Sequence, residues 1–531
     1  MALADDIKAF EAISELPRGR KALVFYSEGP AYWPHLKGIV RELVTVQRCP
    51  LLYVTSSPED PGLKIRDPLV RSFNIGSGGF RKNFFKEIEA DIMALTMPDL
   101  AQLSLPRSAG CGHYAYLFHS PVSTHMIYRE GAFDHYDTIF CVGPHHEAEI
   151  RRREEMTGLT AKRLFPHGYS RLDELLAEDA RRQAAAAKDD GPAQVLVAPS
   201  WGPSGLLETV GAEMVGALLE AGYRVVVRPH PQTMRLSRAR IDELSSRFAD
   251  QPLFVLETDM SSKASFFDSD VVVSDWSGAA LEYAFARLRP VVFVDTPRKV
   301  NNPNWQSLGI APLEDSIRSE IGVVVPADQP SELAPAVAAV IADAQTYSDR
   351  IRAFRRSSIF NEGASDAVAA RELARMTFDV SLGDEGEPEG VESRAAAFAN
   401  SALDSGDDTG SLRAFLKEIV GEATLDAAAL RRLEALCRRV DVQKRLHADY
   451  DPDFRKPTPQ SAAADPNAMP ALICALLRAA QDCGERGLSL KFLGSADNAL
   501  GLYAAAGGVR GIAALESLIA RTSDRVLGEA A

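Results

Sequence analysis

The segment Arg228-Pro229-His230-Pro231 directly follows an apolar run, residues 225–227, that is typical of a buried strand. A guanidinium can contact two phosphate oxygens at once, and an imidazole can donate a hydrogen bond or move a proton. The two prolines restrict the turn, so both side chains would be held with little backbone freedom. We predict that Arg228 binds phosphate and that His230 takes part in the chemistry. The alternative is a sheet-edge turn with a surface histidine.

A second polar segment, Ser274-Asp275-Trp276-Ser277-Gly278, follows the apolar run 271–273 and opens a predicted helix that carries Glu282. Small polar side chains at such a position cap the helix, and its free backbone amides attract phosphate. Asp275 could fix a ligand hydroxyl, and Glu282 could accept hydrogen bonds from a ribose. Capping alone explains Ser274 or Asp275 equally well. With His230 expected in the same lobe, we favour a nucleotide site formed by Ser274, Asp275, Ser277, Gly278 and Glu282.

His119 directly follows a third apolar run, residues 114–118, and precedes Ser120-Pro121. A histidine at a strand end that faces a cleft is suited to act as the general base for an attacking hydroxyl. His113 and His125 lie close by in the sequence, and either could take this role instead. We predict that His119 is the catalytic base.

Other patterns are weaker or argue against particular chemistries. The turn Ala198-Pro199-Ser200-Trp201-Gly202 follows another apolar run, and its glycine permits close approach of backbone to ligand. No HExxH motif or Cys/His pairing is present, so no metal site is expected. The glycine-rich loop 76–79 lacks the GK[ST] of a P-loop, and no GxGxxG follows the first strand. A dinucleotide-dependent oxidoreductase is therefore disfavoured.

These turns need strands to position them, and the sequence alternates strand and helix patterns in two series. The first series predicts strands at 21–26, 51–55, 91–95, 114–118, 138–142 and 162–165, with helices at 35–47 and 144–156. The second predicts strands at 194–198, 223–228, 253–256, 270–274 and 291–294, with helices at 206–221, 241–248, 261–267 and 279–286. The predicted fold class is α/β, with two doubly wound, Rossmann-like lobes in a GT-B-like arrangement. Ligands are expected at the carboxyl ends of the strands and in the cleft.

The same patterns divide the chain into domains. Residues 1–180 are predicted to form an acceptor lobe, and residues 191–380 a nucleotide-donor lobe, joined by a polar, alanine-rich connector. Residues 381–410 are predicted to be an acidic linker, and residues 411–531 a helical accessory domain without a catalytic signature.

Composition sets further limits. The chain has 531 residues, 46% of them hydrophobic, which predicts several domains. A net charge of −14 argues against a nucleic-acid partner, because no overall basic field is present. The six scattered cysteines are typical of reduced, cytosolic thiols. Neither a signal peptide nor an apolar stretch of about 20 residues is found. We expect a cytoplasmic protein whose membrane association, if any, is peripheral, at the inner face of the cell membrane.

The order of these motifs resembles that of the CDP-glycerol glycerophosphotransferases, the family of teichoic-acid polymerases and primases. The resemblance covers roughly residues 110 to 375 and does not reach the helical tail. It rests on six collinear segments: Phe118-His119-Ser120-Pro121, Gly168-Tyr169-Ser170-Arg171-Leu172-Asp173, Ala198-Pro199-Ser200-Trp201, Arg228-Pro229-His230-Pro231, Ser274-Asp275-Trp276-Ser277 and Glu362-Gly363-Ala364-Ser365.

The resemblance implies that His119 activates an acceptor hydroxyl and that Arg228 and His230 bind a pyrophosphate. Ser200, Trp201 and the segment 274–277 would complete the nucleotide site. The implied reaction transfers glycerol phosphate, or a related alditol phosphate, from a CDP-activated donor to a cell-surface polymer or glycolipid, with no further cofactor. The first-lobe turn lacks the glycine and threonine of the family motif, and Gly202 stands where arginine is frequent. These departures leave the donor open.

Two other functions remain in view. A GT-B glycosyltransferase that uses a nucleotide sugar would need the same two lobes, and donor binding would distinguish it. A non-catalytic scaffold would use the helical tail to bind a partner, but the presence of His119, Arg228, His230 and Asp275 argues against it.

Overall fold

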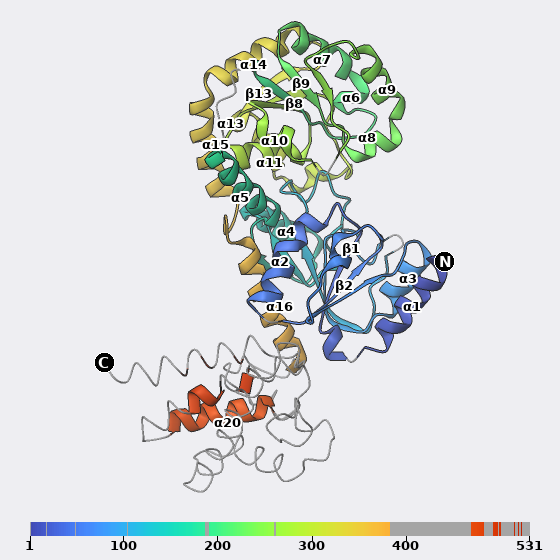
Figure 1. Cartoon of the computed structure of the whole chain (residues 1–531), viewed down its shortest axis with the longest axis vertical. Coiled ribbons are helices and arrows are strands. Elements are labelled where there is room, and N and C mark those ends of the chain that lie inside the picture. Colours follow the sequence, from blue (N-terminus) through green and yellow to red (C-terminus); the bar gives the residue numbers. More distant parts are fainter. Residues whose placement is uncertain are drawn as a thin grey trace, which may run out of the picture.

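The computed structural model describes residues 2–382, except for 17, 48, 103–104, 186–190 and 260–261, together with helix α20 (Met469–Asp482) and short pieces between 492 and 522. Within these residues the chain forms two α/β lobes, each built on one parallel sheet (Figure 1). The predicted fold class is therefore confirmed. From residue 383 the predicted linker, and most of the predicted helical domain, lie outside the described residues. None of the described helices is long and apolar enough to cross a bilayer.

The sheet of the first lobe has seven parallel strands in the order β3-β2-β1-β4-β5-β6-β7. Their apolar runs are buried on both faces in β1, β2, β4 and β6, as expected for a parallel sheet covered by helices. The order reverses between β1 and β4, which places a crevice at the carboxyl ends of the strands. The strands are β1 (Leu23–Ser27), β2 (Leu51–Thr55), β3 (Val70–Asn74), β4 (Ala90–Leu95), β5 (Cys111–Leu117), β6 (Thr138–Cys141) and β7 (Arg163–Pro166).

The sheet of the second lobe has six parallel strands in the order β10-β9-β8-β11-β12-β13. The predicted strands are present, whereas β3 and β13 had not been predicted. Both are edge strands with several residues only partly buried, so their apolar pattern is weak. The strands are β8 (Gln194–Val197), β9 (Arg224–Val227), β10 (Phe254–Leu256), β11 (Val271–Ser274), β12 (Val291–Asp295) and β13 (Gly322–Pro326).

Helices flank both sheets. The single helix predicted over 206–221 is wrong in one respect: it is two helices, because the backbone leaves the helical region at Val210 (φ −117°, ψ 13°). The helices are α1 (Ala2–Ser14), α2 (Trp33–Thr45), α3 (Gly79–Glu87), α4 (Pro144–Thr157), α5 (Ser170–Ala185), α6 (Leu206–Thr209), α7 (Gly211–Glu220), α8 (Pro231–Leu236), α9 (Arg238–Arg247), α10 (Ala264–Asp268), α11 (Gly278–Arg287), α12 (Leu313–Ser316), α13 (Arg318–Ile321), α14 (Leu333–Ala342), α15 (Ala344–Ser358) and α16 (Ser365–Leu382), with 3₁₀ turns η1 (Arg18–Lys21), η2 (Pro61–Lys64), η3 (Trp305–Leu308) and η4 (Pro330–Glu332).

Helices α5 and α16 join the two lobes on one side (Figure 1). Helix α5 packs on α11 of the second lobe, and α16 crosses back to pack on α2 of the first. The crossing is close: a Cβ added to Gly38 would lie 1.7 Å from a side-chain oxygen of Asp366, so a larger residue there would force Asp366 to move. The predicted second lobe ends at residue 380 and so includes most of α16, whereas in the structure α16 packs against the first lobe.

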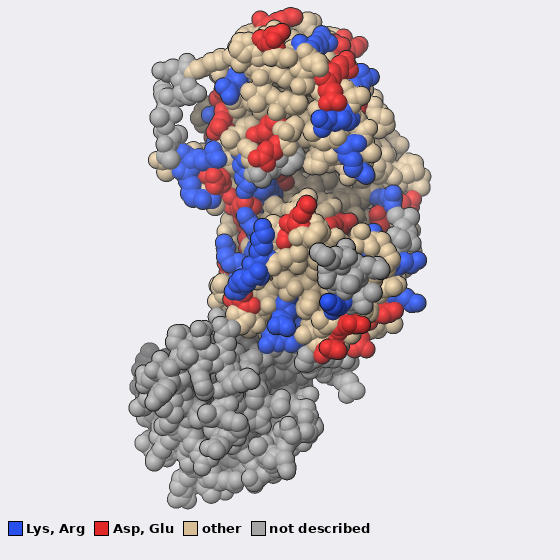
Figure 2. Space-filling view, turned by 45° about the vertical axis from the view of Figure 1, so that its right-hand side comes forward, with Lys and Arg blue, Asp and Glu red and all other residues tan. Residues whose placement is uncertain are grey.

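A loop of the second lobe, residues 301–314, joins the lobes at a second place. The backbone amide and the hydroxyl of Ser123 each donate to the carboxylate of Glu314 at 2.8 Å. Asn302 Nδ2 donates to the carbonyl of His125 at 3.0 Å. The backbone N–H of Asn301 donates to the carbonyl of Met126, also at 3.0 Å. We call this contact the seam. Between the lobes the surface is hollowed (Figure 2).

Candidate active site

His119 follows β5 at the carboxyl edge of the first sheet. Its Nδ1 lies 2.9 Å from the carbonyl oxygen of Thr96, which follows β4. A carbonyl can only accept, so Nδ1 must carry the proton, and Nε2 of the neutral ring carries the lone pair. Burial lowers the pKa of His119 to about 4, although the bond to Thr96 opposes the shift. At neutral pH the ring is therefore an uncharged base, and its Nε2 lone pair has no hydrogen-bond partner among the described residues.

Aromatic side chains surround this imidazole. Its ring centroid lies 5.4 Å from that of Tyr32, 6.0 Å from that of Tyr128 and 6.2 Å from that of His35. Tyr32 in turn lies near Glu28, whose pKa is raised by burial. The sequence prediction missed Glu28 and Tyr32; their position just after the first strand was the available signal.

His230 follows β9 at the carboxyl edge of the second sheet and caps α8. Its Nδ1 accepts a hydrogen bond from the backbone amide of Gln232 at 3.0 Å. Nδ1 of the neutral ring therefore has no proton, and Nε2 carries it. Burial, together with the positive charge of Lys299, lowers the pKa of His230 to about 4. His230 thus offers an N–H donor at Nε2, the opposite of what His119 offers.

Trp201 lies beside His230, with ring centroids 6.0 Å apart and planes 28° from parallel. The ammonium of Lys299, in the loop after β12, lies 4.3 Å from the Trp201 ring centroid. Because β8, β9 and β12 are parallel, the residues that follow them meet at one edge of the sheet. The predicted Ser200 and Trp201 are thus brought together with His230, and Lys299 is a neighbour that the sequence prediction missed.

Ser274 and Asp275 are buried, and their contacts are with the backbone. Asp275 accepts from the amides of Ser200 at 2.6 Å, Trp276 at 2.7 Å and Leu206 at 2.9 Å. The hydroxyl of Ser274 donates to the Ala198 carbonyl at 2.8 Å. These bonds fix the turns after β8 and β11, and neither side chain caps α11, whose N-cap is Ser277. Direct contact of either side chain with a ligand stays a prediction.

The start of α11 reaches the first lobe. Ser277 caps this helix by accepting from the Ala279 amide at 3.3 Å. A Cβ added to Gly278 would lie 2.8 Å from the Ser120 hydroxyl, so the start of the helix approaches the turn that carries His119. Backbone amides at such a helix start favour a negatively charged ligand.

Glu282, one turn further along α11, bridges the lobes through Tyr169. The Tyr169 hydroxyl lies 2.6 Å from Glu282 Oε1 and 3.1 Å from the backbone oxygen of His119. Arg171 is also near, with Nε 3.9 Å from Glu282 Oε2. This contact brings the predicted residues of both lobes together, and it occupies one oxygen of the carboxylate that was predicted to bind a ribose.

Arg228 is partly buried beside Glu257, with Nη1 3.5 Å from Oε2. Burial lowers the pKa of Arg228, and the negative charge of Glu257 opposes the shift. The guanidinium is therefore partly neutralised by a residue of its own lobe. Its predicted contact with phosphate remains a prediction.

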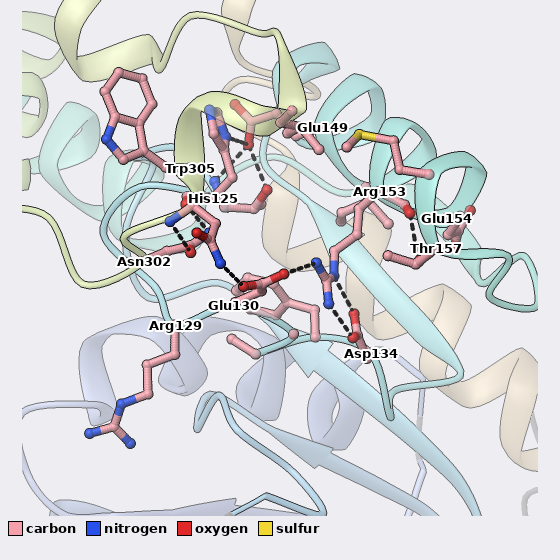
Figure 3. Close-up of a pocket in the computed structure, with 18 of the residues that line it drawn as sticks. His125, Arg129, Glu130, Asp134, Glu149, Arg153, Glu154, Thr157, Asn302 and Trp305 are labelled. Carbon is pink, nitrogen blue, oxygen red and sulfur yellow. Dashed lines mark hydrogen bonds and ion pairs between the residues drawn. The ribbon is translucent and has the colours of Figure 1, made fainter.

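Figure 3 shows a different pocket, of about 110 Å³, at the seam. His125 and Glu149 lie side by side in it, with Nδ1 and Oε2 3.5 Å apart, and Arg153 lies between Asp134 and Glu130. Of the histidines considered as the base from the sequence, only the alternative His125 lines this pocket, and His119 does not. These charged side chains pair with one another, so we interpret the pocket as part of the seam between the lobes.

No family model and no curated protein matches the chain. Solved structures with a similar fold include the wall teichoic acid polymerase TagF, at 15% identity and a TM-score of 0.47, over 72% of this chain and 96% of that one. UDP-GlcNAc 2-epimerase of Methanocaldococcus jannaschii is similar at 13% identity and a TM-score of 0.41, over 66% of this chain and 99% of that one. MurG of Acinetobacter baumannii is similar at 11% identity and a TM-score of 0.37, over 66% and 99%. At these identities the similarity concerns the fold alone.

Proposed function

We propose that this protein is a transferase that moves an activated group from a nucleoside-diphosphate-linked donor to an acceptor hydroxyl. The observation that carries the proposal is the pair of complementary histidines. His119 in the first lobe has a free lone pair at Nε2, and His230 in the second has an N–H at Nε2. One is suited to take a proton from a nucleophile, and the other to bind an anionic leaving group.

The proposed donor is CDP-glycerol or a related CDP-alditol, and the acceptor is a cell-surface polymer or glycolipid. The acceptor oxygen attacks phosphorus and forms the new P–O bond as its proton passes to His119 Nε2. The P–O bond to CMP breaks in line, and the negative charge that develops on CMP is stabilised by His230 Nε2–H and the start of α11. Positioning and electrostatic stabilisation supply most of the rate in such a displacement.

The contact between the lobes supports this division of labour. Ser120, next to His119, approaches the start of α11, and Tyr169 ties the His119 backbone to Glu282. A donor phosphate at the start of α11 would therefore lie near the base. If the donor were a nucleotide sugar, the same groups would serve attack at the anomeric carbon.

A thermal-shift panel of CDP-glycerol, CDP-ribitol, CDP and UDP-sugars tests the proposal. A ligand that binds only the folded state at about 100 times its Kd adds about 2.7 kcal/mol to the free energy of unfolding. We expect stabilisation by the CDP-alditols, followed by transfer of labelled glycerol phosphate to an acceptor. Stabilisation by UDP-sugars alone would identify a glycosyltransferase. Stabilisation by none of them would reject the nucleotide site and favour the scaffold.

A further inference from the structure

Lys299 is a cation whose environment differs from that of its neighbours. Its ammonium faces the Trp201 ring and is partly buried. Within the described part of the chain it makes no hydrogen bond to a side chain and no ion pair with a carboxylate. The preceding residue, Arg298, is exposed and paired with Asp315 at 3.0 Å. The Trp201 face offsets part of the cost of burying this charge, and the remainder is left for other groups to offset.

The charged groups that face Lys299 compensate for its burial only in part. The acids near enough to act on it are Asp275 and Glu208. Asp275 is already bonded to three backbone amides. One oxygen of Glu208 accepts from the Thr233 hydroxyl at 2.9 Å, and the other is buried without a hydrogen-bond partner among the described residues, so neither acid forms an ion pair with Lys299. His230, on the turn after β9, is uncharged at neutral pH and is further disfavoured from charging by Lys299.

We propose that Lys299 is a phosphate-binding residue whose ammonium receives the oxygens of a diphosphate beside the Nε2–H of His230. That this diphosphate belongs to a group-transfer donor rests on the proposed function. The existence of an anion site at Lys299 does not depend on it. The ammonium of Lys299 and the Nε2–H of His230 would bind the same anion, beside the face of Trp201.

Binding at this site depends on pH. Burial lowers the pKa of Lys299 to about 8, and the negative charges of Asp275 and Glu208 limit the shift. An anion binds the charged form of Lys299, so above pH 8 the free protein must take up a proton in order to bind. Affinity therefore falls as pH rises through 8. Between pH 7 and pH 9 the charged fraction of a group with this pKa falls by about tenfold.

The test uses inorganic pyrophosphate and the full chain in isothermal titration calorimetry. Lys299→Gln should weaken binding by about tenfold or more, the usual range for losing a hydrogen bond to a charged group. Lys299→Arg keeps the charge and should bind like the parent at pH 7. Arg298→Gln, at an exposed and paired position, should leave binding unchanged.

Lys299→Arg also isolates the pH effect, because arginine stays charged at pH 9. Pyrophosphate itself titrates in this range, but equally for both proteins. The ratio of the Lys299→Arg affinity to the parent affinity should therefore rise about tenfold between pH 7 and pH 9. A constant ratio, a parent that does not bind pyrophosphate, or a Lys299→Gln variant within twofold of the parent would overturn the inference. Lys299-dependent pyrophosphate binding without transfer from CDP-glycerol would leave this site intact and reject only the proposed donor.

Discussion

Removing the imidazole of His119 should abolish transfer while leaving donor binding nearly normal. A general base acts in the transition state, so its loss lowers turnover more than affinity. The expected loss is about 10² to 10⁴ in rate, or about 2.7 to 5.4 kcal/mol in activation free energy. The assay measures transfer of labelled glycerol phosphate by His119→Ala, with donor affinity measured separately by calorimetry.

The pH profile of the parent gives the same reasoning a second test. Burial lowers the pKa of His119 to about 4, so the ring stays an uncharged base as pH falls from 7.5 to 5.5. The rate, kcat/KM, should stay nearly constant over that interval and fall only towards pH 4. An imidazole with the ordinary pKa of about 6.5 would instead lose about tenfold of its activity by pH 5.5. The acid limb should be absent from any residual activity of His119→Ala.

Two neighbouring histidines serve as matched controls. His113 Nε2 lies 2.8 Å from the Thr138 hydroxyl, and His125 Nε2 lies 3.0 Å from the Ile310 carbonyl. Both rings are thus held in structural contacts, and alanine there should change stability more than turnover. Transfer by His119→Ala within a few-fold of the parent would refute its role as base. So would a selective loss of turnover in His125→Ala.

Three further perturbations follow from the contacts described. Arg228→Ala and His230→Ala should each weaken donor binding with little change in melting temperature; a collapse in melting temperature would show a structural role instead. Burial raises the pKa of Glu314 to about 7, so the folded protein favours the protonated carboxyl. The free energy of unfolding should therefore fall by up to about 3 kcal/mol as pH rises from about 4.5 to 8, which denaturant unfolding of the parent would measure. Glu314→Gln should flatten that dependence, and an unchanged slope would contradict the argument. Truncation after Leu382 should leave a soluble, folded pair of lobes in circular dichroism and thermal melts, since α16 is retained; aggregation would show that later residues complete the core.

The strands that could be predicted are those that lie in the sheet interior. Residues 51–54 form a continuous apolar run because β2 is covered on both faces, and the run alone indicates a buried strand. β3, at the sheet edge, contains Arg71 and Asn74 and is only partly buried, so its pattern carries little information. The approach of α16 to α2 had no signal at all, since it depends on Asp366 meeting Gly38 far away in the sequence.

The candidate site divides in the same way. His119 and His230 could be predicted because each directly follows an apolar strand, where a parallel sheet places its ligands. Their tautomers could not, since these depend on the carbonyl of Thr96 and the amide of Gln232. Lys299 lies several residues beyond β12, within a loop whose course the sequence pattern does not specify.

The two joints between the lobes bear on how the histidines can act. At one joint Tyr169 bonds both the His119 backbone and Glu282, and at the other Ser123 bonds Glu314. Ser123 is only four residues from His119, so the turn that carries the base is linked to the second lobe directly by Glu314 and, through Tyr169 of the first lobe, by Glu282. The position of the His119 turn relative to the second lobe is therefore held by contacts that take no part in the proposed chemistry. A change at Glu314 that leaves both histidines intact should reach the reaction through their separation, and it should lower turnover without altering the pKa of His119.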